Sequence, residues 1–115
     1  MDYRYLDTEL ATEFLGDAQG VHEMLGVLCS TLKTDLPAMH ELLQAHDLQA
    51  IQKSLHSLKG FIPIFSTQTL VDQLIALERL AKAPAALDFQ PQCEALLRAL
   101  ATLLQEAQNY LAQPL

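Results

Sequence analysis

The sequence predicts an all-α protein: an antiparallel up-down four-helix bundle with a short extra N-terminal helix. Three observations favour this fold class. Half of the 115 residues are apolar, and only four glycines and five prolines interrupt the chain. Leucine and alanine, which are strong helix formers, dominate, whereas β-branched residues are scarce. The apolar residues recur at alternating steps of three and four, the period of an amphipathic helix. The length is typical of one domain, so residues 1–115 are interpreted as a single domain.

The first two helices are predicted from their apolar faces. The short first helix is expected to end near Gly16, followed by a connector over residues 17–20, and its apolar face comprises Tyr3, Leu6, Leu10 and Phe14. The second helix has the most regular apolar stripe, which comprises Val21, Leu25, Leu28, Leu32, Leu36, Met39 and Leu43. Pro37 lies inside this stripe and predicts a kink near Thr34, because proline lacks the N–H that the helix needs.

The third helix is expected to follow a break at His46 and Asp47, with Asp47 as its N-cap. Its inner face comprises Leu48, Ile51, Leu55, Leu58, Ile62 and Phe65. Pro63 falls near the end of this pattern and predicts a second kink. Residues 66–68 then interrupt the apolar period.

The fourth helix is expected to start at Thr69, which with Asp72 resembles a capping box, and to end at residues 83–86. Its stripe comprises Leu70, Leu74, Leu77 and Ala81. Asp88 and Pro91 predict the start of the fifth helix, whose stripe comprises Cys93, Leu97, Leu100, Leu104, Ala107 and Leu111. Cys29 and Cys93 both lie at apolar positions, which favours buried free thiols in a reducing compartment over a disulfide.

The composition argues against several classes of function. A formal net charge of −7 disfavours binding to nucleic acid or to an anionic membrane surface. No apolar run approaches the length of a membrane span, and the first ten residues do not resemble a signal peptide. We therefore expect a cytoplasmic monomer that does not itself contact a membrane, although it could be the cytosolic end of a membrane-anchored protein.

His56 is the candidate functional residue of the third helix. At about 100° per residue, it lies roughly 130° from the centre of the apolar stripe, so its ring is expected to face solvent. Its neighbours on this outer face comprise Gln49, Gln52, Lys53, Gly60, Pro63 and Ile64. Gly60 costs the helix roughly 1 kcal/mol without a packing reason, which favours close approach by a partner. An exposed apolar group beside a nucleophile indicates a docking surface.

Metal binding is the first alternative for the histidines. His22, His40 and His46 each precede an acidic residue, but none forms an HExxH pattern, and the chain has no CxxC. We therefore predict no metal site and interpret these three histidines as surface residues.

The run His56-Ser57-Leu58-Lys59-Gly60 resembles the His-x-Leu-Lys-Gly signature of histidine-containing phosphotransfer (HPt) domains of two-component phosphorelays. Similar residues are common in that family at Asp35-Leu36-Pro37, at Asp47 and at Leu77-Glu78-Arg79. The resemblance extends from about Leu6 to Leu111. It departs from the family pattern in Leu55 before the histidine and in the apolar segment of residues 61–64, which we expect to bias the choice of partner.

The resemblance implies a role for each residue of the motif. His56 is expected to be phosphorylated on Nε2, Lys59 to neutralise the phosphoryl group, and Gly60 to leave room for the partner. The residues expected to contact that partner comprise Gln49, Gln52, Lys53, Pro63 and Ile64. Arg79 and Lys82 lie on the following helix, where they either reach the phosphoryl group or are simply solvated.

The expected partners are receiver domains of response regulators and hybrid sensor histidine kinases. The receiver brings the phosphorylatable aspartate and Mg²⁺, so this chain needs no cofactor of its own. It would act as a phosphoryl carrier rather than an enzyme, either free-standing or as the C-terminal module of a hybrid kinase. Two alternatives remain open: an HPt-like module that docks a receiver or kinase without carrying phosphate, and a generic helical oligomerisation domain.

Overall fold

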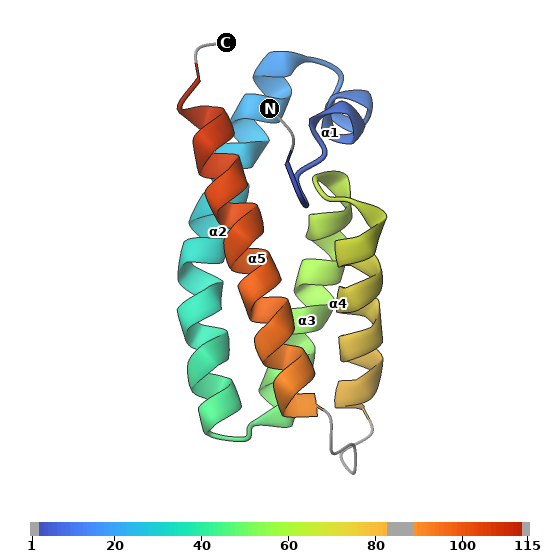
Figure 1. Ribbon diagram of the computed structural model, residues 1–115, viewed down its shortest axis with the longest axis vertical. Coiled ribbons are helices and arrows are strands. Elements are labelled where there is room, and N and C mark those ends of the chain that lie inside the picture. The colour runs from blue at the N-terminus through green and yellow to red at the C-terminus, as the bar shows by residue number, and fades with distance from the viewer. Residues whose placement is uncertain (1–2, 83–88, 114–115) are drawn as a thin grey trace.

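The structure is a computed structural model that describes residues 3–82 and 89–113. Over these residues it consists of α-helices joined by short connections, with one short 3-10 turn. The elements are α1 (Thr8–Leu15), α2 (Ala18–Gln44), α3 (Leu48–Phe61), the 3-10 turn η1 (Ile62–Ile64), α4 (Gln68–Ala81) and α5 (Phe89–Leu111). Figure 1 shows α2 to α5 side by side, with successive helices running in opposite directions and α1 at one end of the bundle. The prediction of an all-α bundle with a short extra N-terminal helix is confirmed.

The four long helices enclose one hydrophobic core. Each packs against two others: α2 against α3 and α5, and α4 against α3 and α5. Every residue of the predicted stripe in α2 is buried. Since full burial of a leucine side chain contributes about 1.5–3 kcal/mol, these stripes supply much of the free energy that opposes unfolding. The inner face of α5 differs slightly from the prediction, because Leu96 and Leu103 are buried while Leu104 and Leu111 are only partly buried.

The N-terminal end of the chain differs from the prediction. The helix does not include Tyr3 or Leu6. α1 begins at Thr8, and Asp7 is its N-cap, whose side chain accepts a hydrogen bond from the Leu10 N–H. The expected connector over residues 17–20 is also wrong, because Asp17 is an N-cap, bonded to the Gly20 N–H, and α2 begins at the next residue. In both places an aspartate side chain satisfies a free N–H of the first turn, so the helix starts directly after it.

Residues 3–7, which we call the N-terminal strap, are tied to the bundle instead. Leu6 pairs with Ser66 in an isolated antiparallel bridge. Around it the Asp7 N–H donates to the Phe65 carbonyl at 2.7 Å, and the Thr67 N–H donates to the Tyr5 carbonyl at 2.8 Å. The strap therefore fixes the segment that connects α3 to α4.

The two prolines that predict kinks, Pro37 and Pro63, behave differently. α2 stays α-helical past Thr34 and Pro37 as far as Gln44, although Pro37 cannot donate to the Lys33 carbonyl. Pro63, in contrast, lies in η1, after α3 has ended at Phe61. The α-helix therefore ends before this proline, and no kink within α3 is needed. The reason is that a proline in the first turn of a new helix needs no N–H donor.

The remaining helix boundaries are partly as predicted. Asp47 caps α3 by accepting from the Ala50 N–H, as expected. The predicted cap at Thr69 is wrong, because α4 already begins at Gln68 and Asp72 accepts instead from the Gln68 side chain at 2.8 Å. The predicted helix end at residues 83–86 and the cap at Asp88 lie outside the described residues.

Cys29 and Cys93 are buried free thiols, as predicted. Burial raises the pKa of both, that of Cys93 to about 11, so neither is a reactive thiolate at neutral pH. Within the described parts of the chain, no helix is both long and apolar enough to cross a membrane.

Candidate functional site

His56 lies in the middle of α3 with its side chain 68% exposed, as expected from its angular position relative to the apolar stripe. Its helix is held by Leu55 and Leu58, which flank it in sequence and are buried in the core. Because adjacent positions on a helix point in different directions, burial of these leucines turns the imidazole outward. The ring is therefore anchored by a rigid helix and remains accessible to a large partner.

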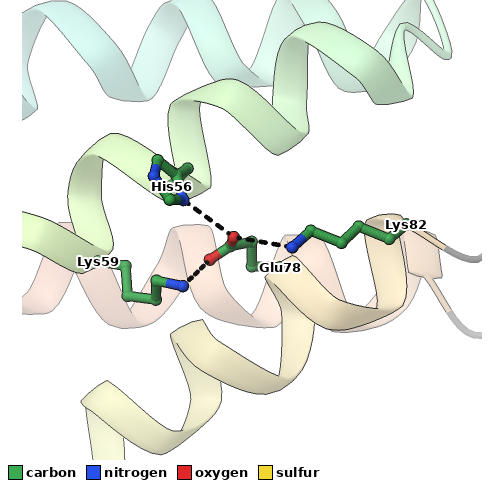
Figure 2. A network of polar contacts seen from close by, with 4 residues as sticks. All are labelled: His56, Lys59, Glu78 and Lys82. Atoms are coloured by element: carbon green, nitrogen blue, oxygen red, sulfur yellow. Dashed lines mark hydrogen bonds and ion pairs between the residues drawn. The ribbon is translucent and has the colours of Figure 1, made fainter.

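The Nδ1 atom of His56 is occupied by Glu78, which reaches it from α4. Nδ1 and Glu78 Oε1 are 3.1 Å apart, and the Glu78 side chain is only 3% exposed (Figure 2). An ionised carboxylate only accepts hydrogen bonds, so Nδ1 carries the proton in this contact. In the neutral ring Nε2 then keeps its lone pair, and this is the nitrogen that does not contact Glu78.

Two lysines share the same carboxylate. Lys59 Nζ lies 2.8 Å from Glu78 Oε2, and Lys82 Nζ lies 3.6 Å from Oε1, the oxygen that also contacts His56 (Figure 2). Oε2 is fully buried, so the Lys59 ammonium at this distance compensates its charge. The result is one buried negative charge that holds two ammonium groups next to the exposed imidazole.

These contacts keep Glu78 ionised although it is buried. The Lys59 ammonium is the largest cause that lowers the pKa of Glu78, with His56 and Lys82 adding to it and burial opposing it; the result is a pKa of about 2. At neutral pH the carboxylate therefore carries its full charge. It can orient the imidazole and compensate positive charge that develops on the ring.

Gly60, the remaining motif residue, and three of the expected docking residues lie on the same helix as His56. Apart from its neighbours in sequence and the backbone of its own helix, a Cβ added at Gly60 would meet no atom within 4 Å, so the space beside it is open. Gln49 and Lys53 are exposed, and Gln52 is half-buried. All four share α3 with His56.

Pro63 and Ile64 do not continue this face. They lie in η1, beyond the end of α3, and both are half-buried, with Ile64 packed against the core. The exposed apolar group that we expected beside the ring from these two residues is therefore smaller and displaced, because the helical register stops at Phe61.

Glu78 is the site residue to which the sequence analysis gave no role. It appeared only in a segment of family resemblance, yet it carries a recognisable signal: a carboxylate that follows Leu77 and stands one turn after Leu74, on the buried face of α4. A charge in that position needs partners, since burial of an unpaired carboxylate is costly.

Across the described residues, no three or more His, Cys, Asp or Glu side chains gather in a way that could hold a metal ion.

The chain matches the model of a known protein family. A family model described as the Hpt domain matches residues 23–110, which include α3, α4 and all four residues of the network around Glu78. No curated protein and no solved structure matches the chain. Because the match covers well over half of the sequence, the chain belongs to the Hpt domain family, whose members carry phosphoryl groups in two-component systems and interact with receiver domains and kinases.

Proposed function

We propose that this chain relays a phosphoryl group between receiver-domain aspartates in a cytoplasmic two-component phosphorelay, through phosphorylation of His56 on Nε2. The observation that carries the proposal is the contact between the exposed His56 ring and the buried carboxylate of Glu78. This contact holds the proton on Nδ1 and leaves the outward nitrogen as the nucleophile.

The transfer needs only one bond to form and one to break. The Nε2 lone pair attacks phosphorus of the aspartyl phosphate, and the bond between phosphorus and the aspartate oxygen breaks with its electron pair, which restores the aspartate carboxylate. The ring becomes positively charged while Nδ1 keeps its proton, and the negative charge of Glu78 faces it. Return of the phosphoryl group to a second aspartate reverses these changes.

Charge compensation completes the proposed mechanism. Phosphoryl transfer depends on alignment and on neutralisation of the phosphoryl oxygens. The ammonium groups of Lys59 and Lys82 are kept near the ring by their shared contact with Glu78. The receiver would contribute the phosphorylated aspartate and Mg²⁺, so the reaction requires no metal ligand from this chain.

The test is transfer of radiolabelled phosphate from a phosphorylated receiver domain to the purified chain. We expect a label that is labile in acid and stable in alkali, and that is lost in His56→Gln. The matched control is His40→Gln, which removes an exposed histidine from α2 and should be labelled like the wild type. Circular dichroism should show the same helical content in both variants.

Two results would contradict this proposal. Label that persists in His56→Gln would place the modification elsewhere. A wild-type chain that binds receivers but accepts no phosphate from any of them would instead favour a docking module.

A further inference from the structure

We propose that the α4 side of the site contains a pocket for an acidic side chain of the partner protein. This inference rests on the proposed function and specifies the kind of surface that the chain recognises. The pocket, which we call the basic hollow, is lined by Lys59, Ile75, Glu78, Arg79 and Lys82 and has a volume of about 170 Å³. It adjoins His56 through Glu78 and lies outside the α3 face on which docking was expected.

The charges of the basic hollow favour a carboxylate. Three cationic side chains line it, against the single carboxylate of Glu78. Glu78 is already engaged by His56, Lys59 and Lys82, whereas Arg79 has no acidic partner among the residues that the structure describes. Arg79 is exposed, and its planar guanidinium is suited to a bidentate contact with a carboxylate.

The distribution of charge over the whole chain supports the same conclusion. Residues 48–82, which include α3 and α4, contain four of the seven Lys and Arg but only two of the fourteen Asp and Glu, a net charge of +2. The rest of the chain contains three basic and twelve acidic residues, a net charge of −9. The surface around His56 is thus the basic part of an acidic protein, and such a surface attracts an acidic partner in the correct orientation.

The chemistry of the partner is consistent with an acidic surface around its phosphorylated aspartate. A protein that donates a phosphoryl group from aspartate with the help of Mg²⁺ must present further carboxylates, because Mg²⁺ is bound through oxygen ligands. When its aspartate lies in line with Nε2 of His56, the surrounding acidic surface meets α3 and α4. The basic hollow then receives an acidic side chain at the edge of that contact, separate from the phosphoryl group itself.

The test compares the charge reversals Arg79→Glu and Arg98→Glu. Both change the net charge equally, but Arg98 lies on α5 in a different cleft, with Arg4 and Gln73. The assay measures kcat/KM for transfer to the receiver that accepts phosphate fastest in a panel of purified receivers. At low salt we expect Arg79→Glu to reduce it about tenfold and Arg98→Glu to leave it within about twofold. Arg79→Lys keeps the charge but loses the bidentate contact, so its defect should be smaller than that of Arg79→Glu. The defect should shrink in 0.5 M salt, because salt screens exposed charges.

Labelling of His56 by phosphoramidate, a small donor that needs no protein contact, separates docking from chemistry. We expect Arg79→Glu to be labelled like Arg98→Glu. Equal transfer to the receiver by these two variants would overturn the proposal that the basic hollow binds an acidic side chain. Loss of phosphoramidate labelling in Arg79→Glu would also overturn it, since Arg79 would then act at the histidine itself. A wild-type chain that is labelled neither by phosphoramidate nor by a phosphorylated receiver would overturn the proposed function instead.

Discussion

Glu78 accepts a hydrogen bond from Nδ1 of His56 across the contact between α3 and α4, although 22 positions separate the two residues in sequence. The orientation of the ring therefore depends on how two helices pack and not only on the helix that carries the histidine. The same carboxylate holds Lys59 and Lys82, so one side chain of α4 organises the polar groups around the proposed nucleophile. Its removal should affect both reactivity and stability.

Substitution of Glu78 should slow phosphorylation of His56. Glu78→Gln keeps an oxygen that accepts from Nδ1 but loses the charge, so we expect labelling by phosphoramidate to slow by roughly threefold to tenfold. Glu78→Ala loses both the accepting oxygen and the charge, so labelling of His56 should be slower still. The measurement is the rate of His56 labelling at neutral pH, with circular dichroism as the control for folding. Wild-type rates in Glu78→Ala would show that the contact does not matter for the reaction.

The dependence of stability on pH should also reveal Glu78. Its folded-state pKa of about 2 lies below the ordinary value of 4.5, so the unfolded chain binds the proton first as the pH falls. The stabilising contribution is complete above about pH 4.5 and is lost as the pH falls towards 2. Allowing for the partial exposure of Lys59 and Lys82, we expect it to be about 1–2 kcal/mol.

Urea unfolding of the wild type and Glu78→Gln at several pH values checks this expectation. The wild type should be the more stable protein at pH 7, and the difference should decrease between pH 4.5 and pH 2. A difference that stays constant over this range would mean that the ionised carboxylate contributes no stability through its contacts with the two lysines and His56.

The fold was predictable from the sequence because each helix buries one regular apolar stripe. Positions such as Leu25, Leu28 and Leu32 are spaced for a single face and are all buried. The N-terminal strap was not predictable in the same way. Tyr3 and Leu6 fit a helical spacing, but Leu6 instead pairs with Ser66, a contact between distant parts of the chain that no local period encodes.

The candidate site was predictable only on one helix. The exposure of His56 follows from its position relative to Leu55 and Leu58, so the sequence was sufficient for it. The role of Lys59 as a partner of Glu78 depends on the contact between α3 and α4, and periodicity gives neither the rotation nor the register of two packed helices. The charge of Glu78 on a buried face of α4 was the available signal that the site includes a second helix.

Glu106 should be important for stability, because its carboxylate ties the N-terminal strap to α5. It accepts from the backbone N–H groups of Arg4, Tyr5 at 2.9 Å and Leu6 at 3.1 Å. Loss of these charge-assisted bonds in Glu106→Ala should lower the free energy of unfolding by about 1–3 kcal/mol. Hydrogen exchange at residues 4–6 should become faster, while phosphoramidate labelling of His56 should remain.

The neighbouring substitution Gln105→Ala is the control for Glu106. Gln105 is exposed on α5, and its side chain contacts Asn109 on the same helix. It should leave exchange in the strap unchanged. If Glu106→Ala exchanged at residues 4–6 as slowly as Gln105→Ala, the carboxylate would not be what holds the strap.

Substitutions of Gly60 by neutral side chains of different size test whether a partner approaches α3 closely at this position. Because a Cβ there meets no atom outside its own stretch of helix, Gly60→Ala should stabilise α3 by about 0.5–1 kcal/mol through helix propensity and leave transfer within about twofold of the wild type. Gly60→Gln has a neutral, helix-favouring side chain, but it projects into the space that the partner would occupy. It should reduce transfer from a phosphorylated receiver by about tenfold or more, since small misplacements of the reacting groups are costly. Phosphoramidate labelling should be equal in both variants. If Gly60→Gln received phosphate from the receiver as fast as Gly60→Ala, the partner would not approach α3 at this position.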